Sequence, residues 1–489
     1  MSKNHKNIIG TEMEWAVMGR LRDSRIYKPL NGDGSMPMSS EILKPGNLPD
    51  GIDSHGSYMS NGSRFYGDVG GHVEYATPEN LSLDDVVLSE FAGEKFVAEV
   101  LRRYVKSSQV VDEVLLYKRV VDDHGTTWGY HVNVSEERKA FALHDGYSLN
   151  NRLAFEDRLR PLLFHYATSL PLLGAGAVYA PGEPGEYKYS LGQKHTDIQY
   201  DVNGSTTSSK PFISTRDEPH ADHKYIRLHI VGTDPHVSPW ATRMMMGTTT
   251  LMLAGIKQGV VRELEYDTGV HSPAASIVRR AKYDIYGEQR YGFRTADGVK
   301  YYADYDVQSM YIDDLSRVKG MTDDQKWSLE EWQKATEDRR SDVMKLSDRS
   351  DTIAKLDLIQ TRNRRAGRKE DEYTKEASDF DKAYSTIVRV RREDVDGGKS
   401  TDDLMNSTVA GVLRRTRFAK HMPAREDLND RILNAPKNTR ASVRGTVIGD
   451  VTLKGASPRL HNLEWGYYSI YKDGVNLDRI NMDPWTGVE

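Results

Sequence analysis

The 489-residue chain contains no cysteine. This excludes disulfide bonds, thiolate zinc sites and a cysteine nucleophile. Long hydrophobic runs are also missing: the most apolar stretch, 244–261, is interrupted by Gly247, Lys257 and Gln258, whereas a membrane-spanning helix needs roughly 20 apolar residues in succession. The hydrophilic start, 1–7, lacks the apolar core of a signal peptide. We therefore expect a buried helix at 244–261, no membrane partner and a cytoplasmic protein.

A surplus of positive charge is missing as well. The formal net charge is −5 at pH 7, which argues against a nucleic-acid partner bound through global positive charge. Two denser basic runs occur at 362–369 and 414–420. Each is either a solvated helix face or a surface for an acidic partner, and the sequence leaves both interpretations open.

The familiar nucleotide-binding glycine motifs are absent. Gly174-Ala-Gly176 lacks the third glycine of a dinucleotide fingerprint and the Lys-Ser/Thr of a P-loop. His220 and His223 have a spacing seen in zinc sites but no clear third ligand. Any nucleotide chemistry must therefore use another arrangement of residues.

The residue pattern changes along the chain from one typical of strands to one typical of helices. Up to about residue 255, short β-type runs alternate with clusters of Gly, Pro, Asn and Asp. Thr322-Asp-Asp-Gln325 then forms a capping-box pattern that predicts a helix start. An apolar stripe on that helix is predicted from five residues, Val343, Leu346, Ile353, Leu356 and Ile359. We expect an α+β fold with a large domain at 1–418 and a small C-terminal domain at 419–489.

The informative feature is a set of short segments whose polar side chains fall two residues apart. Successive side chains on a strand point to opposite faces, so Glu12 and Glu14 share one face while Met13 and Trp15 take the other. One strand of this kind is compatible with a solvent-facing surface, but four together favour a site. The polar face is predicted to carry Glu12, Glu14, Arg64, Tyr66, Asp68, His72, Glu74, His131, Asn133, Tyr225, Arg227 and His229.

These residue types indicate phosphoryl chemistry. Converging carboxylates suit Mg²⁺, a hard cation bound through few carboxylates together with substrate phosphates. Arginine supplies planar donors for phosphate oxygens, and an aspartate among them can act as a general base.

The same segments resemble the signature blocks of the Pup ligase and Pup deamidase family, and most closely those of the Pup ligases. The blocks are Gly10-Thr-Glu-Met-Glu14, the run from Asn61 to Glu79, and Ser214 to Asp222 followed by Tyr225-Ile-Arg-Leu-His229. Weaker similarity runs through 247–250, 354–358, 438–445 and 463–465, so the resemblance covers nearly the whole chain.

The resemblance implies a glutamine synthetase-like fold, in which helices pack a curved antiparallel sheet that holds ATP and Mg²⁺, with a small C-terminal domain. It also implies residue roles. Asp68 matches the catalytic aspartate; Glu12, Tyr66, Glu74 and Glu14 match metal positions; Arg64, Thr77, Trp465, Arg227, His229 and Arg216 match nucleotide-binding positions.

The implied reaction is ATP-dependent. A ligase of this family phosphorylates the side-chain carboxylate of the C-terminal glutamate of Pup, a small, acidic and largely disordered modifier, and transfers it to a substrate lysine. The sister enzyme deamidates Pup and cleaves the same isopeptide bond. The short interval between Gly10 and Asn61, and the length of Asp68-Val-Gly-Gly-His72, favour the ligase. The alternatives are a depupylase and a non-catalytic binder of an acidic disordered partner.

Two blocks depart from the family pattern. The chain reads His131-Val-Asn133 where the family usually has His-Glu-Asn, and Lys118-Arg-Val120 where Lys-Asn-Asn is typical. We expect these changes to weaken a metal or nucleotide contact or to accompany a different substrate.

Overall fold

The computed structural model describes residues 7–30, 39–68, 70–121, 127–141, 149–180, 185–194, 197–206, 208–216, 218, 220–221, 223–267, 269–454, 459–472, 475–476, 479–482 and 484. Its main sheet has twelve strands in the described part of the chain, and β1 (Ile8–Leu21) lies at its centre. The main path of the sheet is β11 (Tyr200–Asn203), β12 (Pro211–Ser214), β13 (Tyr225–Ile230), β8 (Tyr130–Glu137), β1, β6 (Val73–Ala76), β5 (Arg64–Gly67), β4 (Tyr58–Met59) and β3 (Ser54–His55). The second half of β1 pairs with β2 (Tyr27–Pro29) and β7 (Val111–Tyr117), and β7 pairs with β17 (Thr386–Arg391).

Nearly all these pairings are antiparallel; β11 and β12 run parallel. Three smaller sheets accompany the main one: β9 (Ala177–Tyr179) with β10 (Lys188–Ser190); β14 (Glu265–Tyr266), β15 (Tyr291–Thr295) and β16 (Gly298–Tyr302); and β18 (Arg459–Glu464), β19 (Tyr467–Lys472), β20 (Val475–Asn476) and β21 (Ile480–Asn481). The predicted α+β class with a helix-packed antiparallel sheet is confirmed.

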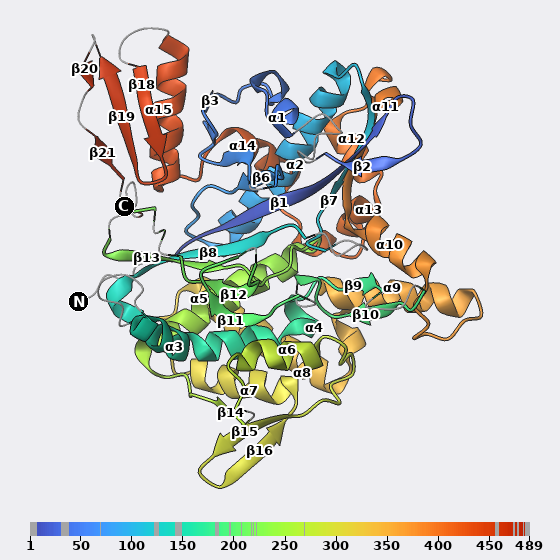
Figure 1. Cartoon of the computed structure of the whole chain (residues 1–489), viewed down its shortest axis with the longest axis vertical. Coiled ribbons are helices and arrows are strands. Elements are labelled where there is room, and N and C mark those ends of the chain that lie inside the picture. Colours follow the sequence, from blue (N-terminus) through green and yellow to red (C-terminus); the bar gives the residue numbers. More distant parts are fainter. Residues whose placement is uncertain are drawn as a thin grey trace.

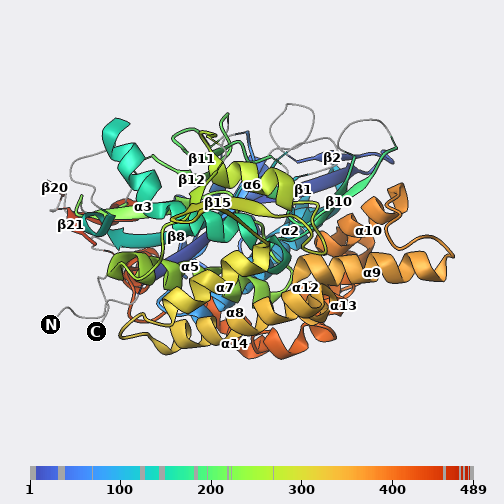
Figure 2. The same ribbon diagram turned by 90° about the horizontal axis from the view of Figure 1, so that it is seen from below.

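Fifteen α-helices accompany the strands among the described residues. Figure 1 shows how they are arranged around the sheet. They are α1 (Ser39–Ile42), α2 (Leu83–Ser107), α3 (Leu149–Thr168), α4 (Leu170–Leu173), α5 (Pro239–Gln258), α6 (Pro273–Ala281), α7 (Asp304–Leu315), α8 (Asp323–Ser341), α9 (Asp351–Arg365), α10 (Lys375–Ser385), α11 (Arg392–Asp396), α12 (Thr401–Asn406), α13 (Val409–Arg415), α14 (Arg425–Leu433) and α15 (Arg440–Lys454). In Figure 2, α5, α7 and α8 lie on one side of β1 and β8.

The sheet has one apolar face and one polar face, as the alternation predicts. On β1, Thr11, Met13 and Trp15 are buried, whereas Glu12 and Glu14 are only partly covered. The apolar face packs against α2 and α5, whose side chains are largely buried. The buried helix expected at 244–261 is present as α5, which begins earlier, at Pro239, and ends at Gln258. Among the described residues, no helix is long and apolar enough to cross a membrane.

The helix predicted to begin at Thr322 does so, with the capping box formed: the Thr322 hydroxyl accepts from the Gln325 N–H. The prediction of one continuous helix is wrong. Helix α8 ends at Ser341, a 3₁₀ turn spans Val343–Asp348, and α9 starts a new axis at Asp351. The Asp342 side chain caps the break, because its carboxylate accepts from the Met344 N–H at 2.9 Å. The five predicted apolar residues are nevertheless all buried.

Charged side chains lie deep in the core beneath β1. Lys118, which is 1% exposed, donates to the carboxylates of Glu90 and Glu94 at 2.5 and 2.6 Å. Arg414 adds a second cation to Glu94 at 2.7 Å. Buried charges of this kind are tolerated only while each has its partners.

Lys118→Met is therefore expected to destabilise the protein by about 3–5 kcal/mol, because it leaves Glu90 without its cation in a low-dielectric core. Lys399→Met is the control: it removes the exposed pair with Asp394 and is expected to cost at most about 1 kcal/mol. Urea unfolding measures both. Equal losses of unfolding free energy in the two variants would show that the buried Lys118 pairs stabilise the protein no more than an exposed pair does.

The C-terminal elements form a small second cluster. Tyr58, Ile448, Leu460, Leu463 and Met482 make its buried core, and α15 with β18 and β19 lies at the upper corner of Figure 1. Phe418 belongs to the main core. The division into domains at 418/419 stays a prediction.

Candidate active site

Strand register gathers the predicted polar residues. On β1 and β6, Glu14 lies opposite Glu74, and on β6 and β5 Glu74 lies opposite Tyr66. Glu12 faces His131 on β8, and His229 on β13 lies beside Asn133. Asp68 follows β5 directly. We call the surface formed by Glu12, Glu14, Tyr66, Asp68 and Glu74 the cradle.

Three carboxylates of the cradle converge. One oxygen each from Glu14, Asp68 and Glu74 lies within 4.8 Å of the other two. Tyr66 donates its hydroxyl to Glu74 Oε1. Burial, together with the neighbouring charges of Glu12, Glu14 and Asp68, holds the pKa of Glu74 well above its usual range. Crowded oxygen donors with uncompensated negative charge fit a divalent hard cation.

Glu12 has a different environment. Its Oε1 lies 3.1 Å from an Arg227 nitrogen, and its Oε2 lies 3.2 Å from His131 Nδ1 and 3.5 Å from His229 Nε2. Burial alone would raise the pKa of Glu12, but Arg227 and the two histidines outweigh burial and hold that pKa well below its usual range. Glu12 is therefore an ionised carboxylate whose charge is already partly balanced.

Glu14 is oriented by a histidine. His72 Nδ1 lies 2.8 Å from Glu14 Oε2. The pKa of Glu14 is raised by burial and lowered more strongly by the hydrogen bond with His72 and other neighbours, so its net shift is downward. His72 was predicted on the polar face but given no role. Its contact with Glu14 makes it a positioning residue of the cradle.

A small pocket opens beside Glu12. It has a volume of about 80 Å³. It lies between the first residues of β1, the end of β6 and the C-terminal elements. Its lining includes Ile8, Ile9, Gly10, Thr11, Glu12, Ala76, Thr77, Pro78, Glu79, Asn133, Ser135, His220, Arg227, Arg440 and Trp465. The Thr77 hydroxyl accepts from the Thr11 N–H at 2.9 Å, which ties the two strands together at this point.

The residues predicted to bind nucleotide fall into two groups. Thr77, Arg227 and Trp465 line the pocket, although they are far apart in the sequence. In the described part of the chain, Arg64, Arg216 and His229 do not line it. Arg64 stacks on the Tyr66 ring, with its guanidinium 4.1 Å from the ring centroid, His229 contacts Glu12, and Arg216 is exposed. Sequence reasoning gave no nucleotide role to Glu79, His220 and Arg440, which line the pocket, although all three lie in segments that carry the family resemblance.

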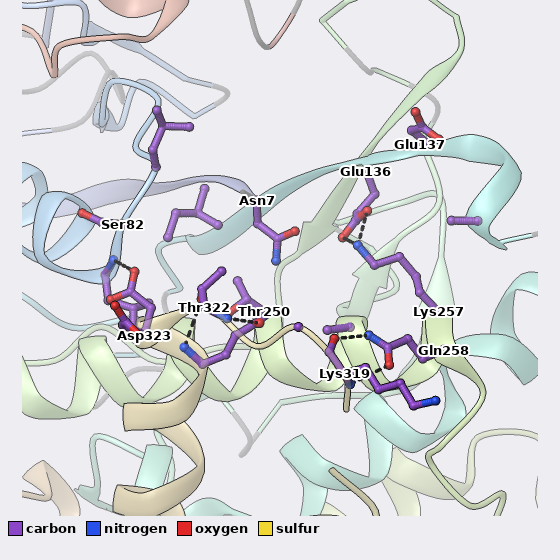
Figure 3. A pocket seen from close by; sticks show the side chains of 18 of the residues that line it. Asn7, Ser82, Glu136, Glu137, Thr250, Lys257, Gln258, Lys319, Thr322 and Asp323 are labelled. Atoms are coloured by element: carbon purple, nitrogen blue, oxygen red, sulfur yellow. Dashed lines mark hydrogen bonds and ion pairs between the residues drawn. The ribbon is translucent and has the colours of Figure 1, made fainter. Parts of the chain in front are cut away.

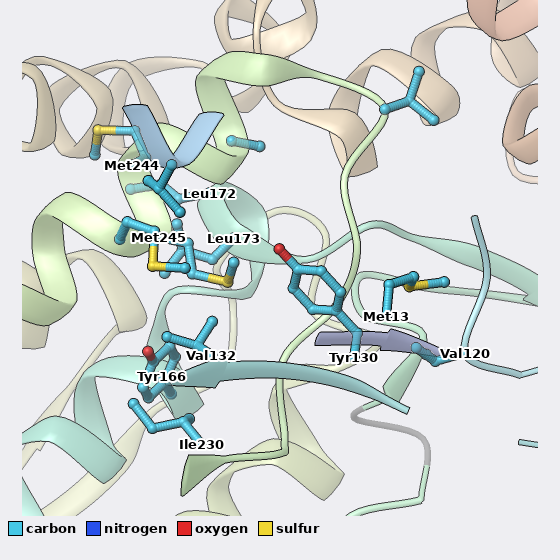
Figure 4. Packing of buried hydrophobic residues seen from close by; sticks show 14 of the residues in the cluster. Met13, Val120, Tyr130, Val132, Tyr166, Leu172, Leu173, Ile230, Met244 and Met245 are labelled. Atoms are coloured by element: carbon cyan, nitrogen blue, oxygen red, sulfur yellow. The ribbon is translucent and has the colours of Figure 1, made fainter. Parts of the chain in front are cut away.

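The departures from the family pattern place no changed side chain in the lining of the pocket beside Glu12, and their effect on metal or nucleotide binding stays a prediction. Val132 is fully buried on the apolar face of β8, among Tyr130, Ile230 and Met245, as Figure 4 shows. In the other block the changed residues are Arg119, whose Nη2 donates to the Asp381 carboxylate at 3.1 Å, and Val120, which is fully buried. Neither of them lines the pocket beside Glu12.

A larger cavity lies across the sheet from the pocket. It has a volume of about 760 Å³ and lies between the end of β8, α5 and the start of α8 (Figure 3). Lys257 bridges both oxygens of Glu136 at its wall, at 2.7 and 2.8 Å. Ser135, the next residue along β8, lines the small pocket instead. None of the cradle carboxylates lines this cavity.

Comparison with known protein families identifies the family to which this chain belongs. The model of the Pup-ligase protein family matches residues 21–467. The chain belongs to this family. It is 32% identical over 342 residues to a depupylase of Acidothermus cellulolyticus, covering 68% of this chain and 63% of that protein. It is 33% identical over 290 residues to a Pup–protein ligase of Kocuria rhizophila, covering 57% and 58% of the two chains.

A longer alignment exists with the Pup–protein ligase of Nocardia farcinica, which is 29% identical and covers 88% of both chains. Among solved structures, the fold matches the Pup ligase PafA in its complex with Pup, with a TM-score of 0.76, 21% identity and coverage of 99% of this chain and 90% of the other. A PafA structure with ADP matches with a TM-score of 0.70 at 23% identity, covering 92% and 89%. The fold expected from the family resemblance is confirmed.

Proposed function

We propose that this protein is a cytoplasmic ATP- and Mg²⁺-dependent ligase. It joins the side-chain carboxylate of the C-terminal glutamate of a Pup-like modifier to a lysine of a protein substrate. The observation that carries the proposal is the position of the Glu14–Asp68–Glu74 cluster, on the same sheet face as a pocket lined by Thr77, Arg227 and Trp465, in a chain of the Pup-ligase family.

The cradle supplies the residues for a magnesium site. Glu14 and Glu74 would hold the ion together with Glu12, and the Tyr66 hydroxyl would support Glu74. A bound Mg²⁺ neutralises charge on phosphate oxygens. Thr77, Arg227 and Trp465 would hold the nucleotide in the pocket. Arg64, Arg216 and His229 remain proposed nucleotide contacts outside the pocket wall, available to phosphates that extend toward the cradle.

The reaction has two balanced steps. A carboxylate oxygen of the modifier attacks the γ-phosphorus of ATP, the bond to the bridging oxygen breaks, and ADP leaves. The lysine nitrogen then attacks the acyl carbon, the C–O bond breaks, and phosphate leaves. The substrate ammonium must lose a proton before its nitrogen can attack. Asp68, at the end of β5 beside Glu74, accepts that proton as general base.

A groove extends the cradle along β1. It has a volume of about 830 Å³ and is lined by Ala16 and Met18, which continue the face of Glu12 and Glu14. Trp128 lines it as well, and the Trp128 ring lies 6.0 Å from that of His72, the partner of Glu14. Basic side chains outnumber acidic ones in the lining: Arg119, Lys382, Arg389, Arg391 and Lys399 against Asp379 and Asp394. An acidic modifier with its C-terminus in the cradle fits this groove.

Replacing both Arg389 and Arg391 with Ala is expected to raise the Kd for an acidic Pup-like modifier by about tenfold, and the difference from the parent should shrink at high salt. Both side chains lie on β17 and are partly exposed. Fluorescence anisotropy of a labelled modifier measures the change. Lys300→Ala, on the exposed strand β16, is the control. An unchanged Kd in the double variant would place the modifier elsewhere.

Trapping of the activated carboxylate tests the proposed function. The protein is incubated with Mg·ATP, a glutamate-ended Pup-like modifier and hydroxylamine, without an acceptor protein. Mass spectrometry is expected to show a modifier hydroxamate together with ADP and phosphate. Nucleotide bound with no hydroxamate formed would contradict the proposal.

The similarity to a depupylase supports a second candidate. A depupylase would release modifier from a preformed conjugate by attack of water on the isopeptide carbon, with lysine as the leaving group. The same cradle would serve it. Cleavage of a conjugate without turnover of ATP, and no hydroxamate, would favour this candidate.

A further inference from the structure

We infer that Arg440, at the start of α15, is a nucleotide-contacting residue supplied by the C-terminal elements, and that Glu79 and Arg444 are positioning residues for Arg440 and Trp465. The inference rests on the proposed function, because it assigns these residues to the same nucleotide pocket. It adds residues far apart in the chain that form one wall of the pocket.

Arg440 is fixed by two contacts and keeps donors for a ligand. Its Nε donates to Glu79 Oε1 at 2.5 Å, and its Nη1 donates to the His220 carbonyl at 2.8 Å. Its Nη2 has no hydrogen-bond partner among the described residues, and Arg440 lines the pocket. A guanidinium held in place on one side presents its remaining N–H groups in a fixed direction.

Arg444, one turn later on α15, completes the cluster. It is fully buried and donates through Nη2 to Glu79 Oε2 at 2.6 Å and to the Gly62 carbonyl at 2.7 Å. Its guanidinium lies 4.6 Å from the Trp465 ring centroid. Trp465 also packs edge-on against Tyr58, with 5.4 Å between centroids. Arg444 thus links the Glu79 carboxylate to the aromatic wall of the pocket.

The charge of the cluster suits an anionic ligand. Two guanidiniums share one carboxylate, so a positive charge is left over at the pocket wall. Burial opposes ionisation of Glu79, but Arg444 and Arg440 outweigh it and lower its pKa to about 2. Glu79 is therefore ionised at neutral pH.

The C-terminal wall of the pocket is held against the main body by close backbone contacts at two glycines, where no side chain would fit. A Cβ added at Gly445 would lie 2.1 Å from the Ser60 carbonyl oxygen, and one at Gly466 would lie 2.8 Å from the His220 carbonyl oxygen. The C-terminal elements therefore meet the main body on both sides of Arg440. Because the pocket needs both surfaces, ligand binding and the seating of α15 are thermodynamically linked.

Calorimetric titration of the full-length protein with Mg·ADP tests the inference. Arg440→Gln is expected to raise the Kd at least about tenfold, and Arg440→Lys and Arg444→Lys by roughly three- to tenfold, because lysine keeps the charge but not the planar fork. In turnover assays Arg444→Lys is expected to raise the KM for ATP while leaving kcat near its parent value, since it disturbs binding and not the reacting groups.

The control is Arg425→Gln, which removes a contact of α14 with Asp402 on α12, two residues that do not line the pocket. Its Kd should stay within about twofold of the parent even where its Tm falls. If the parent binds Mg·ADP and both Arg440 variants bind it equally well, the inference is overturned. If the parent itself does not bind Mg·ADP, the proposed function fails instead. Should Arg440→Gln not fold, Arg440→Lys decides.

Discussion

Asp68→Asn is expected to lower the rate of conjugate formation by roughly 10²- to 10⁴-fold, while Mg·ADP affinity changes little. The amide has nearly the shape of the carboxylate but cannot accept the proton that the substrate ammonium must lose. Asp68 lies within the convergent carboxylates at the end of β5. Single-turnover conjugation, together with nucleotide titration, separates the chemical step from binding.

Asp53→Asn provides the matched control, since this aspartate lies in the loop before β3, outside the cradle. Its rate should remain within about twofold of the parent. The base role of Asp68 would be excluded if Asp68→Asn kept parental rates of conjugation at saturating Mg·ATP. A loss of nucleotide affinity as large as the loss of rate would assign Asp68 to metal binding instead.

Glu74→Gln is expected to reduce conjugation by at least about 100-fold and to raise the Mg²⁺ concentration needed for half-maximal activity. The substitution keeps an acceptor for the Tyr66 hydroxyl but removes one negative charge from the metal-binding group. Burial and the neighbouring negative charges raise the pKa of Glu74. A bound cation is therefore needed to keep this carboxylate ionised. Activity measured across a magnesium titration reports the shift.

Glu137→Gln is the control for Glu74→Gln, because Glu137 ends β8 and pairs with Lys139, outside the cradle. It should leave the magnesium dependence unchanged. The metal assignment is wrong if Glu74→Gln shows the parental magnesium dependence with only its maximal rate reduced.

Much of the site follows from strand alternation. A period of two places Glu12 and Glu14 on one face of β1, and the structure has them there. Strand order does not follow from alternation, because pairing depends on contacts between distant segments. The sequence alone therefore did not place Glu74 opposite both Glu14 and Tyr66.

Other features escaped the sequence for physical reasons. The bonds from Arg440 and Arg444 to Glu79 join residues 361 and 365 positions apart, which no local pattern encodes. The break between α8 and α9 lies within an unbroken apolar stripe, at the point where the Asp342 side chain caps the 3₁₀ turn. The place of Val132, by contrast, follows from alternation: with His131 and Asn133 on the polar face of β8, the Val132 side chain points into the core.

The most direct test of the central claim is intact-mass spectrometry of a reaction containing this protein, Mg·ATP, a glutamate-ended Pup-like modifier and a lysine-bearing acceptor, with Asp68→Asn alongside. We expect an acceptor heavier by the modifier minus one water, formed with ADP and phosphate and absent with the variant. No adduct from the folded, nucleotide-bound parent, but release of modifier from a preformed conjugate, would contradict the ligase assignment.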